Sequence, residues 1–86
     1  MKLKQEFFVR EIDGKTVLIP SDPAVRSRIN RLELNEAGSF LFQRIPNVDS
    51  EESLVNAVLD EYDVDRETAA QDVKEFLARL REYDII

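Results

Sequence analysis

The sequence predicts an α+β domain in which a three-stranded antiparallel sheet is followed by three helices, in the order β-β-β-α-α-α. Asp13-Gly14 separates two segments rich in aromatic and β-branched residues, a pattern typical of a β-hairpin. Residues 31–42 change from polar–apolar alternation to apolar residues at helical spacing without an intervening loop. Two later segments carry apolar residues three and four positions apart, which indicates two further helices.

The hairpin is predicted to pair Phe7–Ile12 with Lys15–Ile19. Glycine tolerates the positive φ of a type I′ turn, and a two-residue turn of this kind fixes the register. Both faces of the hairpin carry apolar residues, so the pattern leaves open which face meets the core. The expected cross-strand pairs are Ile12 with Lys15, Glu11 with Thr16, Arg10 with Val17, Val9 with Leu18 and Phe8 with Ile19.

The stretch after the hairpin is the least regular part of the chain. Prolines in Pro20–Pro23 should end the hairpin, because proline cannot donate to the ladder. We expect Ala24–Asn30 to form a loop in which Val25 and Ile29 are apolar anchors. This loop leads into the third strand, which is placed at Ile29–Leu34.

Each predicted helix follows a residue whose side chain can accept a hydrogen bond from a free amide of the first turn. Asn35 is the expected N-cap of a helix at Glu36–Ile45, which Pro46 should stop. Ser50 and Asp65 are the corresponding caps of the second and third helices. Together these elements describe a winged helix-turn-helix arrangement.

The apolar residues of the last two helices form stripes that should face the core. They are Leu54, Val55, Val58, Leu59 and Tyr62 in the second helix and Ala69, Ala70, Val73, Phe76, Leu77 and Leu80 in the third, and Ile85 and Ile86 should fold back onto the core.

Composition narrows the classes of function. The 86 residues fit a single domain, 1–86, with one modest core. Lys plus Arg number 12 and Asp plus Glu 18, a net charge of −6, whereas nucleic-acid binding normally shows a basic footprint. The chain has neither Cys nor His, so no cofactor or metal site is expected, and the usual nucleophile and general base are missing. No apolar run could span a membrane and no signal peptide is visible, so a cytoplasmic protein without membrane contact is the default expectation.

Three segments resemble a known family. Leu34–Phe42 (LNEAGSFLF) is similar to the "LNETGAxIW" segment of the pyrroloquinoline quinone biosynthesis protein D (PqqD-like) family. Leu54–Asp65 is similar to its "EIVxxLxxEYDVD" segment, and Asp72–Leu80 to its last helix, "DVxxFLxxLxxxGLL". The order and spacing of the three segments match the family. Two loop positions depart from it, because Pro46-Asn47 replaces the usual Asp-Gly and Asp84 replaces the usual Gly.

The resemblance implies a non-catalytic peptide-binding module. Such domains recognise the leader of a ribosomally made precursor peptide and present it to a modifying enzyme, for example a radical S-adenosylmethionine protein. The leader adds as a strand beside the third strand and lies against the last helix, where an open sheet edge offers unpaired amides and carbonyls. The site implied in this chain comprises Arg31, Leu32, Glu33, Leu34, Ala70, Val73, Lys74, Leu77 and Arg81.

The residues of this implied site also have purely structural explanations. Leu32 and Leu34 fit the core, and the row on the last helix also fits a wide buried stripe with Lys74 and Arg81 as solvated charges. Arg79 is not part of this implied site, and Arg79→Ala should do little to binding if Arg79 points away from the groove. A winged-helix DNA-binding regulator is the alternative function, although the acidic helices do not suit phosphate. Both a monomer and a strand-exchanged dimer fit a small sheet with an open edge.

Overall fold

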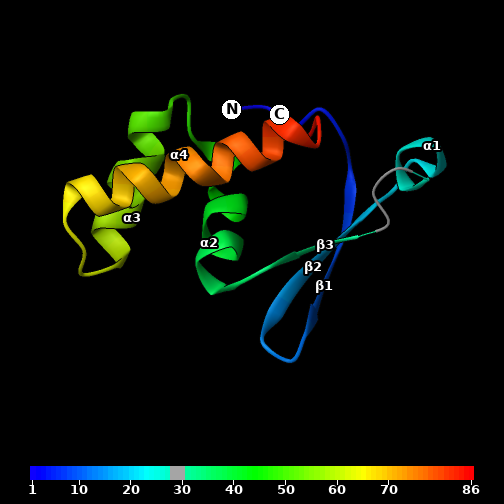
Figure 1. Ribbon diagram of the computed structural model, residues 1–86, viewed down its shortest axis with the longest axis horizontal. Coiled ribbons are helices and arrows are strands. Elements are labelled where there is room, and N and C mark those ends of the chain that lie inside the picture. The colour runs from blue at the N-terminus through cyan, green and yellow to red at the C-terminus, as the bar shows by residue number, and fades with distance from the viewer. Residues whose placement is uncertain (28–30) are drawn as a thin grey trace.

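The computed structural model describes residues 1–27 and 31–86, and Figure 1 shows a small sheet beside a layer of helices. The predicted order of strands and helices is confirmed, with two short additions, α1 and η1. Ile29, an expected anchor of the third strand, lies outside the described residues together with Arg28 and Asn30. The elements are β1 (Phe7–Ile12), β2 (Lys15–Pro20), α1 (Pro23–Arg26), β3 (Leu32–Leu34), α2 (Glu36–Arg44), the 3-10 helix η1 (Ile45–Asn47), α3 (Glu51–Glu61) and α4 (Arg66–Glu82).

The three strands form an antiparallel sheet in the order β1-β2-β3. Both turn residues have positive φ, 52° at Asp13 and 79° at Gly14, as a type I′ turn requires. Every cross-strand pair predicted from this turn is confirmed. Strand β3 pairs Leu34 with Thr16 and Leu32 with Leu18, so β3 lies at one edge of the sheet and β1 at the other.

The register also settles which face of the hairpin meets the core. Thr16 and Leu18 are buried on one face of β2, and Leu32 and Leu34 of β3 share that face through their pairing. Leu18, Leu32 and Leu34 belong to one core cluster with the helices, whereas Val17, on the opposite face, is buried but lies outside this cluster. On β1, Phe8 of the opposite face and Val9 of the inner face are both 56% exposed. The inner face of β2 and β3 therefore packs on the helices (Figure 1). On β1, Phe7 packs against Phe42 of α2, with the ring centroids 6.1 Å apart, and the rest of the strand is exposed.

Three details of the expected boundaries were wrong. Arg31, expected within the third strand, precedes β3, which begins at Leu32. The expected loop after the hairpin contains the short helix α1, which Asp22 caps by accepting a 2.9 Å hydrogen bond from the Ala24 amide. The helix expected to run to Ile45 ends at Arg44, and Pro46 lies inside η1 instead of after a helix stop. Proline is tolerated there because the first turn of a helix uses no intrahelical amide hydrogen bond.

The helical layer has the three predicted N-caps. Asn35, Ser50 and Asp65 accept hydrogen bonds from the third amide of α2, α3 and α4 respectively. Ile85 folds back onto the core as expected and is fully buried, and its carbonyl accepts a 2.6 Å hydrogen bond from the Lys4 amide. The two chain ends thus meet beside α4 (Figure 1). Within the described parts of the chain, every helix is too short or too polar to span a bilayer.

Candidate binding groove

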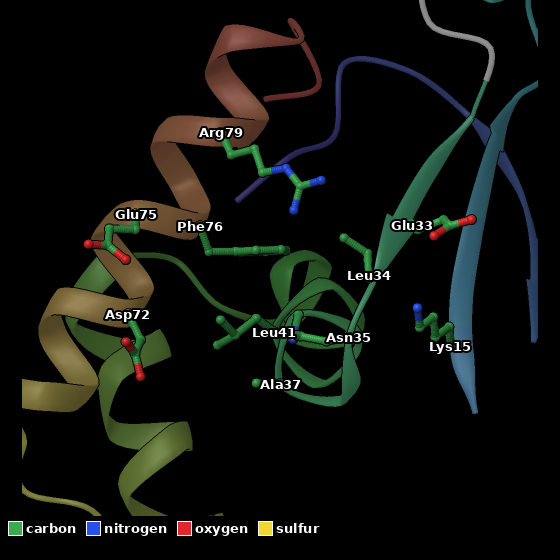
Figure 2. Close-up of a pocket in the computed structure, with 11 residues that line it drawn as sticks. Lys15, Glu33, Leu34, Asn35, Ala37, Leu41, Asp72, Glu75, Phe76 and Arg79 are labelled. Carbon is green, nitrogen blue, oxygen red and sulfur yellow. The ribbon is translucent and has the colours of Figure 1, made fainter. Parts of the chain in front are cut away.

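A groove of about 580 Å³ runs between β3, the first half of α2 and one side of α4. Figure 2 shows β3 and α4 facing each other across it, with the Phe76 ring and Leu34 pointing toward one another. Its floor is apolar and its rims carry charges of both signs. The groove is lined by Lys15, Glu33, Leu34, Asn35, Ala37, Gly38, Leu41, Asp72, Glu75, Phe76 and Arg79.

The direct passage from β3 into α2 builds the floor of the groove. Asn35 ends the strand and caps the helix, accepting a 2.8 Å hydrogen bond from the Gly38 amide. A Cβ on Gly38 would lie 3.2 Å from Asn35 Oδ1, a tight contact, and in ordinary contact with Leu34 and the Phe76 ring at 3.4 and 3.5 Å. Glycine at this position therefore keeps the capping side chain of Asn35 free of a close contact.

The free edge of β3 presents main-chain polar groups to this groove. In a two-residue hairpin the residues that flank the turn form a hydrogen-bonded pair, and bonded and non-bonded pairs then alternate along the ladder. By this alternation Thr16 and Leu18 face β3 and bond Leu34 and Leu32, while Glu33 is the non-bonded partner of Val17. The N–H and C=O of Glu33 consequently point away from β2, toward the groove.

The wall formed by α4 carries an apolar ring and three charges. Asp72, Glu75, Phe76 and Arg79 are three and four positions apart and therefore share one side of the helix. Glu75 accepts a 2.9 Å hydrogen bond from Gln71. The ion pairs among the described residues are Lys4 with Asp84 and Arg31 with Glu33, so the three charged groups of this wall have no ionic partner there.

The β3 part of the predicted site falls at the groove. Glu33 and Leu34 line it. Leu32 and Leu34 belong to the core, at 4% and 1% exposure, with Leu34 also reaching the groove floor. Arg31 is exposed and its guanidinium lies 3.3 Å from the Glu33 carboxylate.

The row predicted on the last helix is not at the groove, and this placement is a correction. Val73 and Leu77 are fully buried in the core. Ala70 and Lys74 instead line a second, smaller groove of about 320 Å³ on the α3 side of α4. Arg81 is exposed and lines neither groove.

Helical phase explains the difference. The buried stripe of α4 is centred on Val73 and Leu80, so the helix has two flanks, and β3 faces the flank opposite to the expected one. Arg79, which was not among the predicted site residues, projects toward β3 (Figure 2). A row at offsets of three and four, from Asp72 to Arg79, was visible in the sequence. Periodicity alone does not tell which flank meets the sheet.

The groove has no metal-binding character in the part of the structure that is described. Groups of three or more Asp and Glu residues close enough to hold a metal ion are absent from residues 1–27 and 31–86. The chemistry on offer is therefore a set of edge amides and carbonyls, an apolar floor and flanking charges. Such a surface can hold an extended chain.

Comparison with known proteins finds one family model and similar solved structures. A family model described as coenzyme PQQ synthesis protein D (PqqD) matches residues 23–86. The solved structure of TbiB1 in complex with the TbiA(beta) leader peptide has 26% sequence identity and a TM-score of 0.77, and the similarity covers 99% of this chain and 93% of that one. A lasso peptide synthetase B1 complexed with the leader peptide has 25% identity and a TM-score of 0.75, over 98% and 93% of the two chains. No curated protein sequence matches significantly.

Proposed function

The chain belongs to the coenzyme PQQ synthesis protein D (PqqD) family, and from this premise we propose that it is a non-catalytic module that binds the leader of a ribosomally made precursor peptide. The leader adds as a strand along β3 and lies in the groove against α4. Two structurally similar proteins are described in complexes with leader peptides, which supports the same class of ligand here.

One observation carries the proposal: the free main-chain groups of Glu33 open onto a groove with an apolar floor. A strand that bonds to Glu33 is in register with the sheet, so its side chains alternate between the two sheet faces. The side chain opposite Glu33 lies on the outer face, and its two neighbours point inward over Leu34 and Phe76. The expected ligand is therefore an extended segment with apolar residues at alternate positions.

The modification itself is assigned to a separate enzyme. With neither Cys nor His in the sequence, the chain lacks the thiolate and imidazole groups that most often act as nucleophile and base. We propose that the module delivers the bound precursor to this enzyme, and a radical S-adenosylmethionine protein is the class expected. It works as a monomer or as a strand-exchanged dimer, which sedimentation of the free protein distinguishes.

The DNA-binding alternative is not favoured. Helix α3 exposes Glu51, Glu52, Asp60 and Glu61, and acidic side chains repel the phosphate backbone. The peptide proposal instead uses the edge and the groove that the fold leaves open.

Isothermal titration with synthetic leader segments tests the proposal. Segments are taken from short precursor-like reading frames beside the gene, and a scrambled peptide of equal composition is the control. We expect saturable binding at micromolar strength or tighter for one segment, and none for the scrambled peptide or for duplex DNA. Binding of duplex DNA with a steep salt dependence, together with no detectable binding of any leader segment, would falsify the peptide assignment.

A further inference from the structure

The charges on the α4 wall of the groove are arranged in a definite order, and Lys15 of β2 adds a cation on the opposite side of the groove. In Figure 2, Asp72 lies on α4 across the groove from the end of β3 that leads into Asn35, and Arg79 lies further along α4, toward the level of the beginning of the strand. Glu75 lies between them on α4, on the outer rim. The wall thus changes from negative to positive along the direction opposite to that of β3.

These charges are available to a ligand. Asp72, Glu75 and Arg79 are exposed, and none of them forms an ion pair within the described residues. By contrast, Glu33 on the opposite rim is paired with Arg31. A charged peptide side chain would therefore meet unpaired partners on the α4 side, where it would not have to displace an existing pair.

We propose that the groove selects leader segments in which Lys or Arg precedes an apolar-x-apolar stretch and Asp or Glu follows it. The inference rests on the proposed function and specifies its ligand. The proposal takes the added strand to run antiparallel to β3, as the paired strands of this sheet do. The N-terminal end of the segment then lies beside Asp72 and Glu75, and its C-terminal end beside Arg79. A parallel strand would require the reverse order of charges.

This charge preference differs from the one expected if Lys74 and Arg81, on the opposite flank of α4, formed the site. Lys74 and Arg81 would suit an acidic leader, but neither lines the groove beside β3. The α4 wall of the groove carries two carboxylates and one guanidinium. A basic residue is attracted by Asp72 and, at longer range, by Glu75, whose side chain points away from β3 in Figure 2, whereas an acidic residue at the same place is repelled. Asp72 and Glu75 are thus the residues that determine specificity.

Selection from a phage-displayed library of random dodecapeptides tests this inference. The wild type should enrich apolar-x-apolar segments preceded by Lys or Arg. The variant Asp72→Lys/Glu75→Lys should enrich Asp or Glu at that place instead. The control variant Asp60→Lys/Glu61→Lys makes the same change in net charge on α3, away from the groove, and should select as the wild type does. Circular dichroism establishes that all three proteins are folded.

Titration of one enriched peptide and its Lys→Glu counterpart gives the size of the effect. For the wild type we expect about fivefold weaker binding of the Glu peptide in dilute buffer, and a smaller ratio in high salt. The double variant should reverse the preference. Enrichment of apolar-x-apolar segments with no preference for charge overturns this inference and leaves the proposed function standing. Failure to enrich any extended segment counts against both.

Discussion

Thr16 donates a 2.6 Å hydrogen bond from its buried hydroxyl to the Ser39 hydroxyl, and this bond ties the central strand to helix α2. Thr16 is 4% exposed, so its hydroxyl has little access to water. Thr16 pairs with Leu34 across the β2–β3 ladder, so the bond is next to the residue that ends β3. It therefore helps to hold the strand edge at a fixed distance from the helix that forms the groove floor.

Ser39→Ala should lower the free energy of unfolding by about 1–2 kcal/mol, because it leaves the Thr16 hydroxyl buried without a partner. The double variant Thr16→Val/Ser39→Ala should cost clearly less than the sum of its two single variants, since both polar partners are removed together. Urea unfolding of the four proteins measures this coupling. Strict additivity would show that the hydrogen bond contributes nothing to stability.

Gly14→Ala should destabilise the protein by about 1 kcal/mol through its backbone alone. Gly14 has φ of 79°, and a Cβ there meets nothing within 4 Å, so no clash adds to the penalty. A synthetic chain with D-alanine at the same position adopts positive φ readily and should be at least as stable as the wild type. Thermal unfolding followed by circular dichroism compares the three chains. Equal stability of the two alanine forms would contradict this explanation.

The hairpin and the caps could be predicted because local chemistry decides them. Asp13-Gly14 fixes a turn type and, with it, every pair of the β1–β2 ladder. The caps at Asn35, Ser50 and Asp65 depend on a side chain and an amide three residues later. Helix α1 escaped prediction although Asp22 and Pro23 have the cap and first-turn pattern, because four residues are too few to show periodicity.

The α4 wall of the groove could not be predicted in the same way. Offsets of three and four identify the buried stripe, and Phe76, Leu77 and Leu80 were expected in it and are buried. Which flank of the stripe meets β3 depends on how α4 crosses the sheet, and this is set by tertiary packing. For this reason Lys74, expected at the rim of the groove beside β3, lines the other groove, and Arg79, which was not predicted there, lines the groove beside β3.

The N-cap of α4 should make stability depend on pH in acid. The hydrogen bonds from the backbone amide and side chain of Thr68 lower the pKa of Asp65 below its ordinary value of 3.8. The folded protein therefore favours ionised Asp65, and its contribution is complete above the unfolded pKa and disappears as pH falls through the lower folded pKa. Asp65→Ala should be less stable than the wild type at neutral pH. Urea midpoints of the two proteins should converge below about pH 4, and a constant difference down to strong acid would argue against an ionised cap.

Two substitutions on α4 compare the loss of stability at a buried position with that at an exposed position. Val73→Asp places a charge in a fully buried position and should cost about 4 kcal/mol or more, enough to unfold much of the protein. Ala70→Asp, one turn away and exposed, should change stability by about 0.5 kcal/mol or less. Chemical unfolding monitored by circular dichroism provides both values. A folded Val73→Asp protein of normal stability would mean that Val73 is a surface residue after all.

Substitution of Glu33 by proline tests strand addition at the level of a single amide. Proline lacks the N–H that points to the groove, whereas the bonds that hold β3 to β2 belong to Leu32 and Leu34 and are retained. Edge strands tolerate proline when its missing N–H faces away from the sheet. The protein should therefore remain folded. Its affinity for a leader segment that binds the wild type should fall about tenfold, the equivalent of one lost hydrogen bond in a desolvated site.

Glu33→Ala is the matched control for this experiment, because it removes the same side chain and the 3.3 Å ion pair with Arg31 while keeping the amide. An exposed ion pair of this kind contributes about 1 kcal/mol at most, so the alanine variant should bind nearly as the wild type does. Titration of the same peptide into all three proteins at one salt concentration isolates the amide. Equal affinities for the proline and alanine variants would mean that the ligand does not bond to the β3 edge, whatever else holds it in the groove.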